Sequence, residues 1–402
     1  MTATAFSDLT EMVIGVKSPP EPFLVRLVRG LAGRGMHVTL AVSHRPDAKW
    51  DAIPNVESMV MPGWDEPIPK RLWRVGRRLG GDIGRSLPET RRFLAAARAG
   101  DTTMHPVERL YRWLPFAGRG WDVLYFPWNA TAVAYLPLMD GRPTVISCRG
   151  AQINVSPHNP RRTALRDGLP ITFARAAAVH CVSDAIREEA MRYGLDPAKA
   201  TIIHPAVDPD VFCPSDAPRA PSDRLRIVST GDVIWRKGLE YALTAMRLLV
   251  DRGVPVQFNI IGSGRENQRL FYTIQDLQLA DHVIWHGRLT PDKVIRRLQT
   301  ADVCLLSSLS EGLSNAALEG MACGLPVVTT DVGGMREAIR DGVEGFLVPA
   351  RDPVAIADAL AELWRQPELR AAMGAAGRAR VVADFRLENQ VDAFARLLGS
   401  VA

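Results

Sequence analysis

The sequence predicts an α/β protein with two doubly wound domains, each built on a parallel sheet. The chain's 402 residues exceed one ordinary core and suit two domains of about 200 residues each. Short apolar runs without polar alternation recur in both halves and alternate with helical patterns, as expected when helices cover both faces of a sheet. A stretch rich in proline and aspartate, residues 204–222, interrupts this alternation and separates the two halves.

The first half is expected to form the N-terminal domain, residues 1–205, with a basic insertion at 65–120. Its apolar runs are short and rich in β-branched residues, and helices at 21–33, 161–177 and 183–193 fill the crossovers between parallel strands. The expected strands are Met12–Val16, Val38–Val42, Val56–Met61, Val123–Phe126, Thr144–Ser147, Val179–Val182 and Thr201–Ile203.

A linker at 206–222 is expected to lead into a second doubly wound domain over residues 223–384. Helices are expected at 353–365 and 367–383, followed by an amphipathic helix at 387–398 with Val391, Phe394, Leu397 and Leu398 on one face. We therefore expect the segment 385–402 to join the first domain. The expected strands are Arg226–Thr230, Gln257–Ile261, Val283–His286, Val303–Leu306, Val327–Thr330 and Phe346–Val348.

The composition is that of a globular protein that we expect in the cytoplasm. Hydrophobic residues make up 47% and charged residues 23%, and no apolar run approaches the roughly 18 residues that span a bilayer. The amino terminus has acidic residues ahead of a very short apolar run, unlike a signal peptide. Five cysteines lie far apart, so we expect neither a disulfide framework nor a metal site. The net charge of +5 mildly favours anionic partners, among which nucleic acid is least favoured because no nucleic-acid-binding signature is present.

The stretch 307–324 combines a loop and a helix start directly behind a buried strand. Gly312 lets the backbone approach a ligand, Ser314 is expected to be the N-cap, and N–H groups at such a helix start face an anion. Glu311 lies in the loop and Glu319 one turn into the helix, roughly 6 Å along its axis at 1.5 Å per residue, so both can border one pocket. An anion flanked by hydroxyl-binding carboxylates describes a nucleotide sugar. The alternative is a loop followed by a capped surface helix.

With these features, the chain resembles family 4 of the retaining glycosyltransferases, which have the GT-B fold of two facing Rossmann-like domains with a cleft between them. The resemblance covers nearly the whole chain and is most specific in EGLSNAALEGMACGLPVVTTDVGG, which carries the family's E-x7-E motif. It implies that Glu311 contacts the donor sugar, that Glu319 binds the nucleotide ribose, and that the first domain binds the acceptor. The residues expected to bind the donor between the two glutamates are Gly312, Leu313, Ser314 and Asn315.

The segment STGDVIWRKGLEYAL resembles the family's turn for the donor diphosphate, with Gly231 near its start. Lys237 is expected to neutralise the diphosphate as it leaves. Asp232 stands where the family often has arginine, so either Arg236 supplies the second positive charge or fewer cations hold the leaving group. A solvated lysine at a helix start is the alternative role of Lys237.

Two more strand ends are expected to line the donor. Gly262 and Gly264 resemble the family's glycine turn beside the donor sugar, although such glycine pairs are common after strands. His286 lies in the segment that borders the nucleobase, and a hydrogen-bonded strand-end histidine is favoured over a catalyst.

The acceptor half departs from the family's patterns. SPPEPF, residues 18–23, replaces a glycine-rich turn and resembles the start of polysaccharide transferases, with Glu21 at the matching position. Arg149 stands where relatives often have a histidine near the donor sugar. It could bind an anionic acceptor or the diphosphate, or form a structural salt bridge. Asn154 and His158 follow in the same loop, and His158 is a second candidate for the missing histidine.

The D-x-D of Asp208 and Asp210 lies in the linker, where a structural turn is favoured over a Mg²⁺ site. We therefore expect no metal and no cofactor, with the nucleoside diphosphate sugar acting as donor substrate. Its diphosphate would be neutralised by Lys237, Arg236 and helix N-termini.

The basic insertion contains KRLWRVGRRLGG, residues 70–81. Helical spacing places Leu72, Val75 and Leu79 on one side with Trp73 beside them, and the surrounding positions are Lys70, Arg71, Arg74, Arg77 and Arg78. This pattern suits an anionic membrane surface, so peripheral attachment to the inner face of the membrane is a hypothesis. The alternative is a helical arm that packs on its own domain through the same leucines.

Together these features predict a retaining, metal-independent glycosyltransferase that moves a sugar from a nucleoside diphosphate to a hydroxyl acceptor. The acceptor is expected to be a glycan or a lipid-linked precursor in polysaccharide or glycolipid biosynthesis. Two alternatives stay open: a nucleotide-sugar epimerase or phosphorylase on the same fold, and a nucleotide-sugar-binding protein without turnover.

Overall fold

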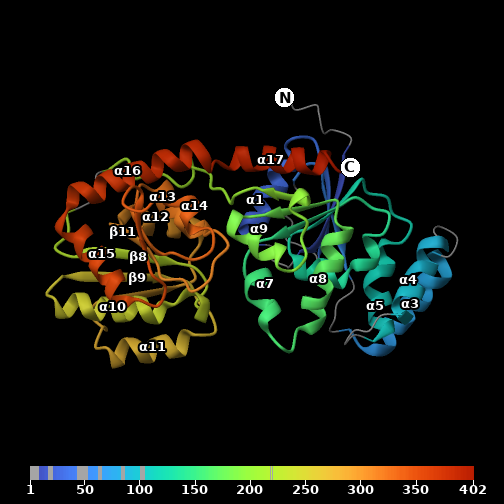
Figure 1. Cartoon of the computed structure of the whole chain (residues 1–402), viewed down its shortest axis with the longest axis horizontal. Coiled ribbons are helices and arrows are strands. Elements are labelled where there is room, and N and C mark those ends of the chain that lie inside the picture. Colours follow the sequence, from blue (N-terminus) through green and yellow to red (C-terminus); the bar gives the residue numbers. More distant parts are fainter. Residues whose placement is uncertain are drawn as a thin grey trace. The chain divides into compact units, whose positions relative to one another are not determined.

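A computed structural model describes residues 9–16, 21–42, 53–61, 66–82, 87–99, 105–217, 219 and 221–402 (Figure 1). The chain divides into two compact units. The first comprises the described residues up to Val182, together with Ile186–Ile203 and Val391–Ala402. The second comprises Ser183–Ala185 and His204–Gln390.

The first unit is built on a seven-stranded sheet with the order β3-β2-β1-β4-β5-β6-β7, in which every described strand pair is parallel. The chain first adds strands on one side of β1 and then, from β4 onward, on the other side, and this change in strand order is typical of a doubly wound Rossmann-like fold. All seven expected strands are present, with ends shifted by one or two residues. Their bounds are β1 Thr10–Val16, β2 His37–Val42, β3 Val56–Val60, β4 Val123–Phe126, β5 Thr144–Cys148, β6 Ala178–Cys181 and β7 Ala200–Ile202.

Helices cover this sheet and extend from it as an arm. The described helices along this part of the chain are α1 Pro22–Ala32, α3 Ile68–Asp82, α4 Leu87–Ala99, α5 Pro106–Trp113, α6 Asn129–Ala134, α7 Ala151–Asn154, α8 Thr163–Arg175 and α9 Asp184–Met191. The described 3-10 turns between them are η1 Leu114–Phe116, η2 Leu136–Leu138, η3 Ser156–His158 and η4 Pro197–Lys199.

The arm consists of α3, α4 and α5, which lie within the predicted basic insertion. Val75 of α3 is buried in the same apolar cluster as Phe93 of α4 and Trp113 of α5. Leu72 and Trp73 point away from this cluster, with 49% and 60% of their surfaces exposed. The sequence grouped Leu72 and Val75 on one side, and this is wrong because only Val75 faces the arm's interior. The side chain of Leu79 lies outside the described residues.

The second unit contains a six-stranded parallel sheet with the order β10-β9-β8-β11-β12-β13. All six expected strands are present, and the prediction of two parallel-sheet domains is confirmed. The strands are β8 Leu225–Thr230, β9 Val256–Ile261, β10 Val283–Gly287, β11 Val303–Leu306, β12 Val327–Thr330 and β13 Gly345–Val348. The helices are η5 Trp235–Lys237, α10 Leu239–Asp251, α11 Asn267–Asp276, α12 Pro291–Thr300, α13 Asn315–Ala322, α14 Met335–Ala338, α15 Pro353–Arg365 and α16 Pro367–Asp384.

The last helix, α17 (Leu387–Gly399), is divided between the two units: residues up to Gln390 belong to the second and residues from Val391 to the first. Its apolar face is buried as the amphipathic pattern predicts, with Phe394 fully enclosed. The Phe394 ring packs edge-on against His180 at 4.6 Å and Tyr125 at 5.8 Å between ring centroids. The end of the chain is therefore part of the core of the first unit.

No helix in the described parts of the chain is long and apolar enough to cross a membrane.

Candidate active site

The predicted glycine turns of the second domain meet at the carboxyl ends of β8, β9 and β10. The Gly231 amide donates to the Ile261 carbonyl at 3.0 Å, and the Gly262 amide donates to the Gly287 carbonyl at 2.8 Å. Gly262 has φ of 147°, and a Cβ there would lie 1.8 Å from the Gly231 carbonyl oxygen. Only glycine fits this approach. Gly264 follows in the same turn, where its amide donates to the side chain of Asn267.

The turn that carries Lys237 is joined to the end of β11. Gly238 ends η5 in the left-handed region with φ of 56°, and a Cβ there would lie 2.2 Å from the Ser307 carbonyl oxygen. The Ser307 hydroxyl donates to the Lys237 carbonyl at 3.0 Å, and the Leu309 amide donates to the Arg236 carbonyl at 2.7 Å. These contacts place Lys237 beside the loop that follows β11.

Lys237 and Glu311 form an ion pair, with Nζ and Oε1 2.6 Å apart. The Ser308 hydroxyl donates to the same carboxylate oxygen at 2.7 Å. Burial alone raises the pKa of Glu311, but the charge and hydrogen bond of Lys237, the Ser308 hydrogen bond and the charge of Arg236 outweigh it, so the pKa is lowered. Glu311, which is only 9% exposed, is therefore an ionised carboxylate held in place by two donors.

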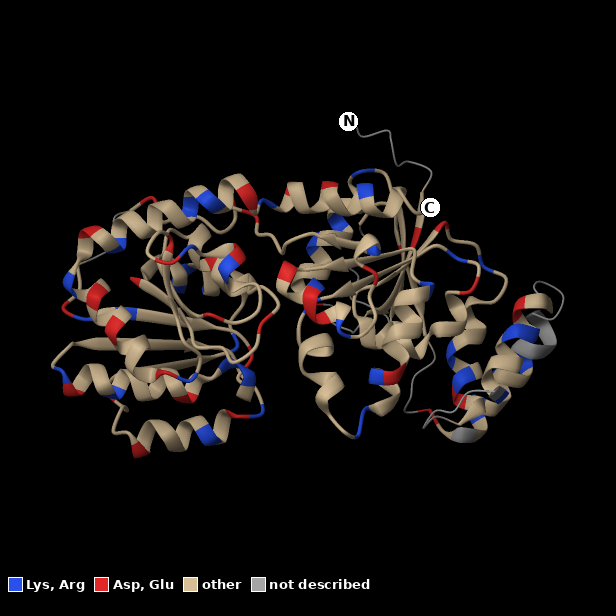
Figure 2. Cartoon of the chain, viewed as in Figure 1, with Lys and Arg blue, Asp and Glu red and all other residues tan. Residues whose placement is uncertain are grey.

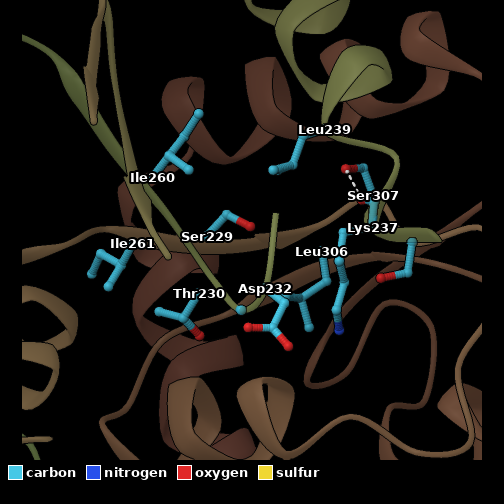
Figure 3. A pocket seen from close by; sticks show the side chains of 11 residues that line it. Ser229, Thr230, Asp232, Lys237, Leu239, Ile260, Ile261, Leu306 and Ser307 are labelled. Carbon is cyan, nitrogen blue, oxygen red and sulfur yellow. Dashed lines mark hydrogen bonds between the residues drawn. The ribbon is translucent and has the colours of Figure 1, made fainter. Parts of the chain in front are cut away.

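A small hollow adjoins the Lys237 side chain at the carboxyl ends of β8, β9 and β11 (Figure 3). Gly231, Asp232 and Lys237 line it, together with Ser307 and Ser308. Ligands of open α/β sheets bind at this edge. Lys237 therefore borders both the hollow and the buried carboxylate.

Asp232 has a partner that the sequence did not indicate. Its carboxylate lies 3.4 Å from the Arg288 guanidinium, with 67% and 75% of the two side chains exposed. An exposed pair of this kind is weak, but it offsets part of the negative charge beside the hollow. Arg236 forms no ion pair within the described residues, although its charge contributes to the lowered pKa of Glu311.

Ser314 occupies the N-cap position of α13 with extended backbone angles, as expected, but its side chain makes no capping hydrogen bond. The prediction of a serine cap is wrong on this point. The loop is held from another side, because the Gly334 amide donates to the Gly312 carbonyl at 2.7 Å and the Thr330 hydroxyl donates to the Ser308 carbonyl. Leu313 is buried and Asn315 half-buried in this loop and helix start.

Sequence reasoning overlooked Ser308 and Thr330 as support for Glu311. The signal that could have found them is the pair of strand ends that flank the E-x7-E motif. Parallel neighbouring strands bring their carboxyl ends together, and β11 pairs with β12 from Cys304 to Leu306. Thr330 is the last residue of β12, and Ser308 lies two residues after the end of β11.

Glu319 is half-buried on α13. Burial and then the charge of Glu319 raise the pKa of the Cys304 thiol to about 12, so the carboxylate lies within electrostatic range of β11. Ribose binding by Glu319 stays a prediction.

His286 is hydrogen-bonded at the end of β10, with Nε2 2.9 Å from the Asn259 side-chain oxygen. Burial and the charge of Arg297 lower its pKa, which favours the neutral imidazole. Next to it, the Trp285 indole donates to the Gly262 carbonyl at 2.9 Å and stacks on Phe271. These contacts match the strand-end role favoured for His286.

Arg149 lies in the first domain, directly after β5, and neutral groups hold it. Its Nε donates to the Pro127 carbonyl at 3.2 Å and its Nη2 donates to the Tyr125 hydroxyl at 2.8 Å. Its guanidinium carbon lies 4.3 Å from the centre of the Phe23 ring. Within the described residues no carboxylate pairs with Arg149, so the proposed structural salt bridge is not found there.

A hydrogen-bond relay continues from Arg149 into the core. The Nε2 of His180 lies 2.8 Å from the Ile203 carbonyl, which can only accept, so Nε2 carries the proton and Nδ1 accepts from the Ser147 hydroxyl at 2.6 Å. Ser147 then accepts from Tyr125 at 2.8 Å, and Tyr125 accepts from Arg149. Each group in the relay donates a hydrogen bond to the next one, from Arg149 to the Ile203 carbonyl. The relay contains no carboxylate.

The other acceptor-side candidates have less defined contacts. Glu21 is the N-cap residue of α1 without a side-chain cap, and residues 18–20 lie outside the described part. His158 is exposed at the end of a 3-10 turn, and Asn154 ends α7.

Asp208 and Asp210 lie in a turn. The Asp208 carboxylate accepts the amides of Asp210 and Val211 at 2.9 and 3.3 Å, and Asp210 pairs with Arg386 at 3.1 Å. Among the residues that the structure describes, no group of three or more His, Cys, Asp or Glu residues could hold a metal ion.

Comparison with protein-family models matches both halves of the chain. Residues 21–211 match Glycosyltransferase Family 4, and residues 215–380 match Glycosyl transferases group 1. The first model covers most of the N-terminal domain and the second most of the C-terminal domain, and neither reaches the last helix, α17.

Curated relatives of the chain are named as glycosyltransferases. The D-inositol 3-phosphate glycosyltransferase of Acidothermus cellulolyticus is 34% identical over 194 residues, which cover 44% of this chain and 43% of that protein. The enzyme of the same name from Mycolicibacterium gilvum is 29% identical over 299 residues, which cover 68% of this chain and 67% of that protein. A protein of Escherichia coli K12 proposed to be a colanic acid biosynthesis glycosyltransferase, WcaL, is 33% identical over 47% of this chain and 48% of its own. The chain spans about half the length of the first relatives that it matches.

Solved structures share the fold over the whole chain. HepE of Anabaena in complex with UDP and glucose aligns with a TM-score of 0.73 at 16% identity, covering 97% of this chain and 99% of that one. The sucrose-phosphate synthase of Thermosynechococcus elongatus aligns with a TM-score of 0.76 at 20% identity, covering 98% of both.

Proposed function

Because the chain belongs to the family 4 glycosyltransferases, we propose that it moves a sugar from a nucleoside diphosphate to a hydroxyl acceptor. The transfer retains the anomeric configuration and needs no metal ion. The observation that carries this proposal is the ion pair of Lys237 and Glu311 beside the hollow at the carboxyl edge of the second sheet.

The pair supplies both charges that the reaction requires. Negative charge grows on the diphosphate as the bond between it and the sugar breaks. The Lys237 ammonium can stabilise this charge while it also contacts Glu311. Positive charge grows on the sugar, and the ionised Glu311 can stabilise it. No residue is assigned as a covalent nucleophile, so Glu311 orients and stabilises the donor sugar instead of attacking it.

The donor is proposed to be a UDP-sugar, and the acceptor a glycan or lipid-linked precursor. HepE, with the same fold, has been solved in complex with UDP and with UDP-glucose, which makes uridine the first nucleoside to test. Relatives named for D-inositol 3-phosphate and for colanic acid biosynthesis support a polyol or glycan acceptor.

The decisive experiment is a transfer assay with UDP-, GDP- and ADP-sugars against a panel of glycan and polyol acceptors, with and without EDTA. We expect transfer that EDTA does not reduce and a product linkage, read by NMR, with the donor's anomeric configuration. Altered sugar or sugar phosphate formed without an acceptor would favour an epimerase or phosphorylase. Donor binding without transfer or hydrolysis would favour a protein without turnover.

We extend the proposal to peripheral attachment at an anionic membrane through the exposed side of α3. Leu72 and Trp73 are exposed there, and the Arg77 guanidinium lies 5.0 Å from the centre of the Trp73 ring. Figure 2 shows Lys and Arg along the arm with Asp and Glu among them. Arg71 pairs with Glu108, and Lys70 and Arg74 pair with Glu66, so Arg77 is the better cation for a membrane.

The membrane proposal is tested with a Trp73→Ser, Arg77→Gln variant and vesicles of neutral or anionic lipid. We expect binding to anionic vesicles to fall about tenfold, because an arginine near such a surface contributes about 1 kcal/mol and the indole adds buried area. Arg252→Gln, an exposed arginine of the second domain, is the matched control. Equal vesicle binding by both variants would contradict the proposal.

A further inference from the structure

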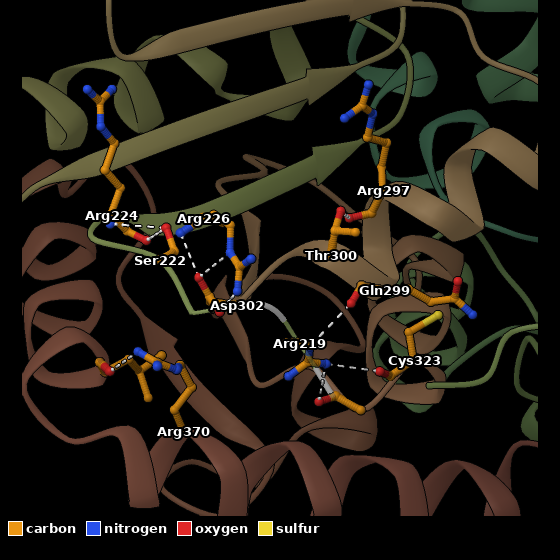
Figure 4. A network of polar contacts seen from close by, with 12 residues as sticks. Arg219, Ser222, Arg224, Arg226, Arg297, Gln299, Thr300, Asp302, Cys323 and Arg370 are labelled. Atoms are coloured by element: carbon orange, nitrogen blue, oxygen red, sulfur yellow. Dashed lines mark hydrogen bonds and ion pairs between the residues drawn. The ribbon is translucent and has the colours of Figure 1, made fainter. Parts of the chain in front are cut away.

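The second domain has another hollow, at the amino ends of its strands. It has a volume of about 350 Å³. The donor-side hollow follows the carboxyl end of β8, whereas this one adjoins its start, about 20 Å away at roughly 3.3 Å per residue. The side chains that carry the argument are Arg219, Arg224, Arg226, Asp302, Trp364 and Arg370, of which Figure 4 labels all but Trp364.

Positive charge in this hollow exceeds negative charge. Asp302 is the only carboxylate among the described residues that line it, and Arg226 binds both of its oxygens at 2.9 and 3.0 Å. The exposed Glu368 lies near in sequence but does not line the hollow. The Asp302 charge is therefore already matched by Arg226.

The other three arginines donate to backbone carbonyls. Arg219 donates to Cys323 and Gly324 at 3.2 and 3.1 Å. Arg370 donates to Leu363 at 3.0 Å, and Arg224 donates to Asp281 at 3.3 Å. These contacts fix the guanidinium groups without cancelling their charge, and within the described residues none of the three forms an ion pair.

The guanidinium groups also affect one another. Burial lowers the pKa of Arg219, Asp302 opposes this, and the charges of Arg226 and Arg370 add to the lowering. Like charges gathered around a hollow repel each other, and a bound anion would relieve that repulsion.

Two neighbouring features suit a ligand with an anionic group. The first turn of the 18-residue helix α16 lines the hollow through Pro367 and Arg370, and its N-cap Gln366 makes no side-chain cap. The half-buried Trp364 provides an aromatic wall.

We propose that this hollow binds the phosphate or pyrophosphate group of a small molecule, at a site separate from the donor pocket. Arginine is suited to this role because its planar fork donates two hydrogen bonds to a phosphate. The proposal does not depend on the proposed transferase activity.

The test is calorimetry on the full chain with UDP present in excess, so that the donor pocket is filled. Inorganic phosphate, pyrophosphate and glucose 6-phosphate are titrated separately. We expect pyrophosphate to bind in the presence of UDP. Tighter binding of glucose 6-phosphate than of phosphate would identify a phosphorylated metabolite as the ligand and would be lost in Trp364→Ala. Equal binding of the two would identify the inorganic ion.

Arg370→Gln and Arg219→Gln should each weaken pyrophosphate binding about tenfold or more, because each removes a charge-assisted hydrogen bond. Arg370→Lys should recover part of the lost affinity. Arg297→Gln is the matched control, because Arg297 is exposed on α12 and does not line the hollow. Unchanged UDP affinity reports native folding of each variant. Pyrophosphate binding that UDP abolishes, or that Arg370→Gln leaves unchanged in a folded protein, overturns the proposal.

Discussion

The two domains hold their candidate cations in opposite ways. Lys237 in the second domain pairs with the buried Glu311, whereas Arg149 in the first is held by a hydroxyl, a carbonyl and a phenyl ring. The paired lysine contributes little net charge before a ligand arrives. The arginine keeps its full charge, because the relay behind it is neutral. If the proposed function holds, the Lys237 site suits a charge that changes during reaction, whereas the Arg149 site suits an anion that is already present.

The same contrast applies to two buried carboxylates. Glu311 has a cation, a hydroxyl donor and a lowered pKa. Glu11 on β1 is fully buried, and neither of its oxygens has a hydrogen-bond partner in the described part of the chain. Burial raises the pKa of Glu11 to about 8. Partners therefore decide whether a buried acid is charged at neutral pH.

The largest expected effect comes from substituting either member of the Lys237–Glu311 pair. Glu311→Gln should lower kcat by about 10² or more, with binding of bare UDP retained, because one electrostatic group is removed from the reacting centre. Lys237→Ala should lower both kcat and UDP affinity. It should also destabilise the domain by about 3 kcal/mol, because Glu311 is then left buried without its cation. Turnover, UDP calorimetry and thermal unfolding are measured on each variant.

The double variant sharpens this prediction. If the pair acts as a unit, the double variant loses little more activity than Lys237→Ala alone. Lys293→Ala, which removes an exposed lysine of the same domain, is the matched control. Full activity of a folded Glu311→Gln protein would refute the site.

The second effect is on stability and concerns Glu11. Its pKa rises from the ordinary 4.5 to about 8 on folding, so the folded state holds a proton that the unfolded state has released between these values. The free energy of unfolding therefore falls by about 1.4 kcal/mol per pH unit as pH rises through this window. Between pH 6 and pH 8 the free energy of unfolding of the wild type should fall by about 2 to 3 kcal/mol more than that of Glu11→Gln.

Melting curves at several pH values, with unfolding of the first domain followed separately, measure this difference. Glu311 has the opposite sign, since its lowered pKa contributes stability that is lost as pH falls through the folded value. Parallel pH profiles of wild type and Glu11→Gln above pH 6 would show that Glu11 is already ionised in the fold.

The third effect, of about tenfold, comes from breaking the relay behind Arg149. Tyr125→Phe removes the hydroxyl that accepts from Arg149 and donates to Ser147. If Arg149 binds an anion, the KM of the substrate that carries it should rise, while kcat changes less. Arg149→Gln should give the same pattern, larger.

Kinetics of Tyr125→Phe, Arg149→Gln and Arg149→Lys with a phosphorylated and an uncharged acceptor measure this effect. If Tyr125 has only a structural role, Tyr125→Phe should lower the melting temperature and change the KM of the two acceptors equally. Equal losses on both acceptors would exclude recognition of an acceptor anion by Arg149.

The smallest effect is expected at Asp232. Asp232→Asn removes a carboxylate beside the donor-side hollow and should tighten UDP binding about two- to fivefold at low salt, with the gain shrinking as salt rises. The gain is limited because Arg288 already offsets part of the charge. Weaker UDP binding by this variant would mean that Asp232 contributes to the donor site.

Most of the fold could be predicted because it depends on local patterns. Buried parallel strands are short apolar runs, and the amphipathic face of α17 is visible in the spacing of Val391, Phe394 and Leu398. The three helices of the arm were harder. Leu72 and Val75 share a helix face by spacing, but packing of α3 against α4 and α5 buries only Val75.

The candidate site was predictable where a motif fixes the backbone and less so where distant side chains meet. Glycine at 231, 238 and 262 marks the turns directly. The pairing of Lys237 with Glu311 depends on the order of β8 and β11 in the sheet, which no local pattern contains. The same holds for the Asp232–Arg288 pair and for the relay through Tyr125, Ser147 and His180.

The shared helix α17 has a consequence for synthesis of the protein on the ribosome. The first domain is complete in sequence up to Ile203 except for the segment from Val391, whose Phe394 fills its core. About 190 residues must be translated between these two points, which takes about 10 to 40 seconds at 5–20 residues per second. We therefore expect the nascent first domain to expose the apolar surface around His180 and Tyr125 to chaperones until the segment that contains Phe394 emerges and covers it.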